Sequence, residues 1–164
     1  MKKFSEFIVG ESFHSTCSIS DDELGEYLKF SKIRNVFLED KTKNNQKLVS
    51  GRAILSRMEG EFTRLNQIYG NHIIFLGTDG DPNWKNRNTR FLKPVHTNQI
   101  LKLKFTVSEK QDMDDEFGKI TIDYEGSTQD NELIIISKKN IYRIKKEPAQ
   151  QSIKNKTQKQ TSMD

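Results

Sequence analysis

Polar and apolar residues alternate along much of the second half of the chain. The alternation is clearest in residues 100–110, ILKLKFTVSEK, and it recurs in residues 118–128, GKITIDYEGST. A period of two is typical of strands that bury one face. The apolar or mixed segments 72–78, 88–95 and 132–146 complete a series of about five strands. Consecutive strands joined by turns predict an antiparallel sheet.

A helical spacing of apolar residues marks residues 50–66, SGRAILSRMEGEFTRLN. The residues at three- and four-residue steps are Ile54, Met58, Phe62 and Leu65. A wide apolar face of this kind predicts a helix laid along the sheet. Gly60 interrupts it, and a helix-interior glycine costs about 1 kcal/mol relative to alanine. Either close packing or simple tolerance must therefore account for Gly60.

The first forty residues predict a short strand, a short helix and an irregular segment. The strand covers Phe13 to Ile19, and Ser20 begins the helix with Glu23 at the spacing of a capping box. Residues 30–40, FSKIRNVFLED, keep neither period, so they either connect two elements or hold a site. The element order predicts an α+β fold, with one curved antiparallel sheet wrapped around one long helix. Residues 1–147 are expected to form this single domain.

Composition narrows the functional class. The chain of 164 residues has one cysteine, Cys17, which excludes an internal disulfide framework and an all-cysteine metal site. We expect Cys17 to be buried in a strand. No apolar run is long enough to cross a membrane, and the N-terminal residues lack the apolar run of a secretory signal. A cytoplasmic protein without membrane partners is predicted.

The net charge of +4 is concentrated at the C-terminus. Residues 145–164 hold five lysines, Glu147 and Asp164, so 5 − 2 = 3 of the four charges lie there. The remaining chain is close to neutral and shows no basic stripe, so nucleic-acid binding is not favoured. Residues 148–164 are polar and lack aromatic residues, and we predict a disordered basic tail. An interaction arm is the alternative for this tail.

Two sequence motifs resemble those of the MaoC-like dehydratase, or (R)-specific enoyl-CoA hydratase, family. The first is similar to its F-x-x-G-x-x-F entry, with Phe7, Gly10 and Phe13 in place. The second, RFLKPVHTNQIL, is similar to its RF-x-x-PV-x-x-GD-x-L passage and keeps Arg90, Phe91, Pro94, Val95 and Leu101. The resemblance covers about residues 4–146. It implies a hotdog fold, a homodimer, and coenzyme A only as part of a substrate or ligand.

The resemblance also explains the irregular segment. The family has S-G-D-x-N-P-x-H-x-D there, and its Asp and His transfer protons when water adds to an enoyl thioester. In this chain Ser31, Asn35 and Asp40 match. The Asp position is Ile33 and the His position is Leu38, and neither side chain can transfer a proton. The family's catalytic pair is therefore absent, with Asn35 and Asp40 as weak substitutes.

A second part of the family site lies at the start of the long helix. The family has a tripeptide such as H-G-M there, and the backbone N–H of its glycine polarises the thioester carbonyl. The corresponding residues here are Ser50, Gly51 and Arg52. These residues could still bind a carbonyl or a phosphate. Alternatively, Ser50 is only an N-cap and Gly51 only lets the chain turn.

Basic residues cluster on and before the RFLKPV segment: Lys85, Arg87, Arg90 and Lys93. They could meet the phosphates of a coenzyme A ester, or they could simply be the solvated face of a strand. The candidate substrate-binding residues are Ser31, Asn35, Ser50, Gly51, Arg52 and Arg90. No metal is predicted, because the acidic loops that begin at Asp79 and Asp112 lack the glycine of a calcium loop.

The sequence therefore predicts a divergent MaoC-like protein that binds an acyl-CoA or acyl-carrier thioester. It either lacks hydratase activity or forms the inactive half of a pair with an active homologue. One alternative is an active dehydratase, hydratase or thioesterase that uses other residues. Another is a non-enzymatic interaction module that uses the basic tail.

Overall fold

The computed structural model describes residues 1–36, 46–79 and 88–148. Several residues of interest lie outside these ranges: Leu38, Asp40, Lys85 and Arg87. Residues 149–164 of the predicted tail also lie outside the described residues.

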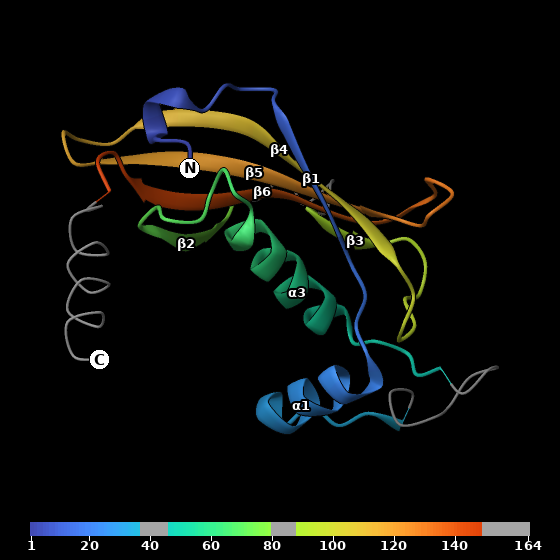
Figure 1. Ribbon diagram of the computed structural model, residues 1–164. Coiled ribbons are helices and arrows are strands. Elements are labelled where there is room, and N and C mark those ends of the chain that lie inside the picture. Colours follow the sequence, from blue (N-terminus) through green and yellow to red (C-terminus); the bar gives the residue numbers. More distant parts are fainter. Residues whose placement is uncertain (37–45, 80–87, 149–164) are drawn as a thin grey trace, which may run out of the picture.

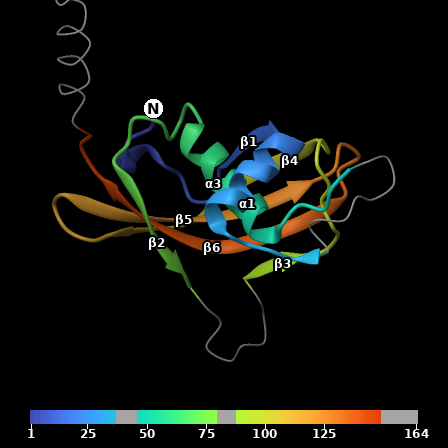
Figure 2. The same cartoon turned by 90° about the horizontal axis from the view of Figure 1, so that it is seen from below.

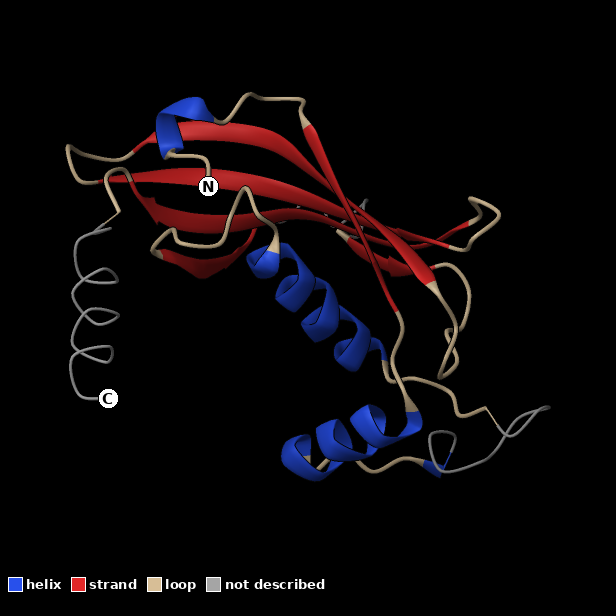
Figure 3. Ribbon diagram, viewed as in Figure 1, coloured by secondary structure: helices blue, strands red, loops and turns tan. Residues whose placement is uncertain are grey.

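Six antiparallel strands form one curved sheet (Figures 1 and 3). The strands are β1 (Ser12–Cys17), β2 (Ile73–Thr78), β3 (Thr89–Phe91), β4 (Leu101–Asp112), β5 (Phe117–Ser127) and β6 (Leu133–Lys145). Their order is β1-β4-β5-β6-β2, and β3 also pairs with β6. The predicted α+β architecture is confirmed, and Cys17 is buried at the end of β1 as expected.

Helices α1 (Asp21–Ser31) and α3 (Gly51–Arg64) lie on the concave side of the sheet (Figure 1). The short helix η1 (Phe4–Glu6) lies beside β4, near the N-terminus. Helix α3 crosses beneath the sheet, and α1 lies on the side of α3 away from the sheet (Figures 1 and 2). The sequence did not predict η1. No helix in the described part of the chain has both the length and the apolar character to cross a membrane.

The core is centred on Phe62 of α3. Its ring lies 5.5 Å from that of Phe105, 5.9 Å from that of Tyr124 and 5.1 Å from that of Tyr142, measured between centroids. These three partners come from β4, β5 and β6. Because Phe62 and Met58 are fully buried, α3 is fixed across the middle of the sheet. Side chains on the flanks of α3 are thereby held in defined positions.

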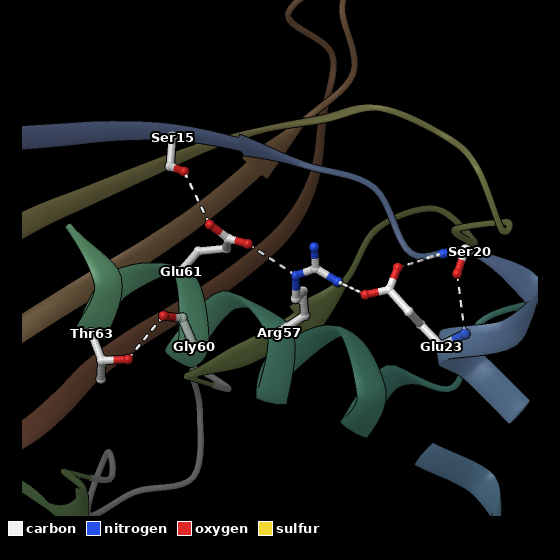
Figure 4. A network of polar contacts seen from close by, with 7 residues as sticks. All are labelled: Ser15, Ser20, Glu23, Arg57, Gly60, Glu61 and Thr63. Atoms are coloured by element: carbon white, nitrogen blue, oxygen red, sulfur yellow. Dashed lines mark hydrogen bonds and ion pairs between the residues drawn. The ribbon is translucent and has the colours of Figure 1, made fainter. Parts of the chain in front are cut away.

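Helix α1 is attached to α3 by a polar network (Figure 4). Glu23 donates its N–H to Ser20 Oγ and accepts the Ser20 N–H, both at 3.1 Å, so the predicted capping box is confirmed. Arg57 of α3 contacts Glu23 at 2.7 Å and Glu61 at 3.0 Å. The Ser20 backbone N–H and, to a lesser extent, Arg57 hold the pKa of Glu23 below its usual value. The network fixes α1 beside α3.

The glycine inside α3 has no packing role. A Cβ built on Gly60 would meet no atom within 4 Å, and the Thr63 hydroxyl donates to the Gly60 carbonyl at 2.8 Å. Of the two explanations that the sequence left open, tolerance is therefore the one that the structure supports.

Candidate functional site

A cavity of about 350 Å³ lies between α3 and the sheet. Helix α3 lines it with Arg52, Leu55, Ser56 and Glu59. Their spacing of three and four residues places them on one face of the helix, beside the buried face that carries Ile54, Met58 and Phe62. The volume is within the range of small-molecule sites, about 300–1,000 Å³. One flank of the central helix is therefore open to a ligand.

The remaining lining of the cavity is rich in aromatic residues. Phe75 of β2, Tyr124 of β5, Tyr142 of β6 and Tyr27 of α1 all contribute. The rings of Phe75 and Tyr142 lie 5.5 Å apart between centroids. The cavity thus combines apolar surface with hydroxyl groups.

The two sheet tyrosines form a buried hydrogen-bonded pair. The hydroxyls of Tyr124 and Tyr142 bond to each other, and the two residues are 3% and 2% exposed. Burial raises the pKa of Tyr124, and the neighbouring Tyr142 raises it further. Burial also raises the pKa of Tyr142, and the negative charge of Glu59 raises it further. Both hydroxyls are therefore protonated at physiological pH, and they line the cavity together with Glu59.

A bulge in the sheet shapes the wall beside the tyrosine pair. The register of β5 and β6 shifts between residues 122 and 124, and Lys139 adopts a left-handed conformation there with φ 58°. Asn140, which also lines the cavity, donates its side-chain amide to the carbonyls of Ile122 at 3.1 Å and Ser137 at 3.0 Å. Bulges of this kind often redirect side chains next to binding sites.

The irregular segment that the sequence singled out does not line the cavity where it is described. Helix α1 runs through Ser31, whose hydroxyl accepts the N–H of Ile33 at 3.3 Å. Lys32 ends the helix in a left-handed conformation with φ 62°, at the position where the resembling family has glycine. Asn35 is exposed. Ser31 and Lys32 thus shape the end of α1, while Leu38 and Asp40 lie outside the described residues.

Of the three predicted binding residues at the start of α3, one lines the cavity and two do not. Ser50 is the N-cap residue, but its side chain makes no capping hydrogen bond. A Cβ on Gly51 would lie 2.8 Å from the ring of Phe91, so a larger residue here would displace that ring, and the φ of Gly51 is not left-handed. Arg52 is exposed and lines the cavity. Of the six predicted substrate-binding residues, Arg52 is the one that the structure places in the cavity.

The basic cluster does not gather at the cavity in the part of the chain that the structure describes. Arg90 is exposed on β3, opposite Ile136 of β6, and is not part of the lining. Lys93 is paired with Glu132. Arg52 is therefore the basic residue of the described lining. Within the described ranges, no group of three or more His, Cys, Asp or Glu side chains could hold a metal ion.

Sequence reasoning missed most of the residues that line the cavity. Glu59, Tyr124 and Tyr142 are not among the six residues that the sequence predicts to bind a substrate. The available signal was the mixed stripe Arg52, Leu55, Ser56 and Glu59, which is neither the apolar face nor the fully charged one. A mixed stripe next to the buried face indicates a helix flank at the edge of the core.

Comparison with known proteins identifies the fold. A monoamine oxidase regulatory protein from Archaeoglobus is 21% identical with a TM-score of 0.67, over 89% of this chain and 95% of that chain. An R-hydratase from Pseudomonas aeruginosa is 17% identical with a TM-score of 0.62, over 89% and 85%. A Mycobacterium tuberculosis protein described as a double hotdog fold is 13% identical with a TM-score of 0.64, over 90% of this chain and 44% of that chain.

Solved MaoC-like dehydratases are also among the similar structures. No protein-family model matches the chain, and no curated protein matches it. The chain therefore has the hotdog fold that MaoC-like dehydratases and (R)-hydratases share, as the sequence resemblance predicted.

Proposed function

We propose that this protein binds an acyl thioester in the cavity between α3 and the sheet. The observation that carries the proposal is the position of this cavity along the central helix of a hotdog fold, with aromatic residues and one arginine in its lining. Leu55, Phe75 and Tyr27 offer apolar contacts for an acyl chain. The exposed guanidinium of Arg52 suits a phosphate of coenzyme A or of an acyl carrier's prosthetic group.

We further propose that the hydratase reaction of the resembling family does not occur through its usual acid–base pair. Ile33 occupies the position of the catalytic Asp, and its hydrocarbon side chain cannot accept or donate a proton. A placed acid or base contributes about 10²–10⁴ in rate, so its loss removes most of such an activity. The cavity is thus a binding site first, and any chemistry must come from its own lining.

The proposed state is a homodimer that pairs through the edge formed by β2 and β3. Both strands pair with β6, so they lie one after the other along the same edge of the sheet. Large exposed apolar residues follow this edge: Ile74, Phe75, Leu76, Phe91 and Leu92. An open edge with exposed apolar side chains favours association with another strand. A second copy related by a two-fold axis offers the same strand in the antiparallel orientation.

Analytical ultracentrifugation tests the dimer. The wild-type chain should sediment as a dimer, and Leu76→Glu should dissociate it because the new charge would lie at the shared edge. Met113→Glu is the matched control, since Met113 is similarly exposed at 44% but lies just after β4, away from this edge. A monomeric wild type would contradict the homodimer and favour pairing with a different hotdog chain.

Calorimetric titration with crotonyl-CoA and with one long-chain acyl-CoA tests the ligand. Saturable binding is expected with one of these thioesters, and free coenzyme A should bind more weakly because it lacks the acyl chain. Ser56→Trp should block binding, since Ser56 lines the cavity, whereas Ser5→Trp places the same side chain on the exposed surface of η1 and should not. The absence of heat with both thioesters would refute the proposed ligand.

A further inference from the structure

Glu59 of α3 differs from the nearby carboxylates Glu61 and Glu23 in its ion pairing. Glu61 and Glu23 are both paired with Arg57. Glu59, which lines the cavity, forms no ion pair with a lysine or arginine among the described residues. It shares the lining with the hydroxyl pair of Tyr124 and Tyr142. The cavity therefore contains a partly buried carboxylate that no cation neutralises.

The hydroxyl pair gives this carboxylate a fixed environment. Tyr124 and Tyr142 bond to each other, and both line the cavity together with Glu59. Burial and the negative charge of Glu59 raise the pKa of Tyr142, so its hydroxyl stays protonated and adds no second anion to the lining. The carboxylate oxygens of Glu59 keep lone pairs that can accept a proton from a bound water molecule, which is the role of a general base.

The number of carboxylates in the cavity lining bears on which reaction a bound thioester can undergo, hydration of an enoyl group or hydrolysis of the thioester bond. Adding water to an enoyl group requires a base for the water and a separate proton donor for the α-carbon. Hydrolysis requires only the base, because a thiol has a pKa of about 8.5 and the thiolate leaves without prior protonation. Glu59 is the only carboxylate in the described lining of the cavity. Burial raises the pKa of the Tyr124 and Tyr142 hydroxyls, which makes them poor proton donors to the α-carbon. A single carboxylate thus favours hydrolysis.

We propose that Glu59 is the catalytic base of thioester hydrolysis in this cavity, an inference that rests on the proposed binding of an acyl thioester. The Glu59 carboxylate removes a proton from water while the water oxygen bonds to the carbonyl carbon. The carbon–sulfur bond then breaks, and the departing thiolate takes the proton from the Glu59 carboxylic acid. The products are a carboxylic acid and a free thiol, and Glu59 is regenerated. Tyr142 and Tyr124 are positioning residues for Glu59.

The test measures release of free coenzyme A from crotonyl-CoA and from one long-chain acyl-CoA, alongside calorimetric binding of the same thioesters. Glu59→Gln should lower the hydrolysis rate by about 10²–10⁴ at unchanged affinity, since it removes the base but keeps the shape of the side chain. Glu61→Gln is the matched control, because Glu61 lies on the same helix but faces Ser15 and Arg57 (Figure 4). Its rate should stay near that of the wild type.

Two further variants extend the test. Tyr142→Phe should lower the rate of hydrolysis less than Glu59→Gln does, with affinity retained, because the base remains. Glu59→Asp keeps a carboxylate one methylene shorter, so it should retain part of the activity, and it covers the case in which Glu59→Gln does not fold.

The outcomes separate this inference from the proposed function. Binding without hydrolysis by the wild type would overturn the catalytic role of Glu59 and leave thioester binding intact. Hydrolysis that persists in Glu59→Gln, or that falls equally in Glu61→Gln, would also overturn it. No binding and no hydrolysis would overturn both.

Discussion

Gly60 offers a sharp test of how α3 is built. It is the tenth of the fourteen residues of the helix Gly51–Arg64, away from both ends. A methyl group at this position would meet no atom within 4 Å, so Gly60→Ala introduces no steric conflict. Alanine also has less freedom than glycine in the unfolded chain, and this difference favours the folded state.

The expected gain follows from helix propensity. Alanine in a helix interior is favoured over glycine by about 1 kcal/mol, so the free energy of unfolding should rise by about that amount. For a chain of this length, 1 kcal/mol corresponds to an increase of roughly 2–4 °C in the melting temperature. Thermal unfolding followed by circular dichroism measures the shift, and urea unfolding should show a higher midpoint with the same slope.

Gly118→Ala is the matched control. A Cβ on Gly118 would lie 2.3 Å from the ring of Phe4, so the same substitution should destabilise the protein by about 1–3 kcal/mol. If Gly60→Ala lowered the melting temperature or left it unchanged, the reasoning would be refuted, because residue 60 would then not be an unobstructed helical position.

Three further substitutions test local features of the N-terminal region. Lys32→Gly should raise the free energy of unfolding by about 1 kcal/mol, because Lys32 ends α1 in a left-handed conformation that glycine adopts without strain. Urea unfolding measures the change, and the absence of any gain would contradict the left-handed conformation. Ser20→Ala should lower the free energy of unfolding by about 1 kcal/mol, because the substitution removes the side-chain cap of α1. An unchanged midpoint of urea unfolding would show that the cap contributes nothing. Burial acts to raise the pKa of Glu11, but Lys2 and the N–H of Ile8 outweigh it and hold the pKa below its usual value of 4.5. Glu11 therefore stabilises the fold fully above pH 4.5, and this contribution is lost as the pH falls through the lower pKa of the folded state. Lys2→Met should lower the free energy of unfolding at pH 7 and should reduce its decrease as the pH falls below 4.5. Identical pH profiles of the variant and the wild type would contradict the role of Lys2 in lowering the pKa of Glu11.

The elements that the sequence predicted well are those whose pattern is local. The apolar steps of α3 through Ile54, Met58 and Phe62 match its buried face, and the capping box at Ser20 and Glu23 forms as predicted. The alternating strands also occur within a few residues of their predicted bounds. In each case the residues that decide the structure are close together in the sequence.

The site was harder to predict because its residues come from distant parts of the chain. Glu59 and Tyr142 are separated by more than eighty positions, and no local pattern shows that β6 brings them together. The role of Gly51 depends on Phe91, which approaches it from β3. The family resemblance directed attention to the segment after α1, whereas the described lining of the cavity includes no residue of that segment. Tertiary packing, not helix or strand period, decides which polar residues share a cavity.

The partners of β6 also determine when the fold can form. Both β2 and β3 pair only with β6 among the described strands, and β5 has β6 as one of its two neighbours. During synthesis, the segments around Phe75 and Phe91 therefore leave the ribosome before the strand that they pair with exists. Their backbone N–H and C=O groups cannot pair in the sheet until residues 133–145, the last of the described strands, have been made. Until then, these apolar segments are unpaired strands of the kind that can associate with other chains.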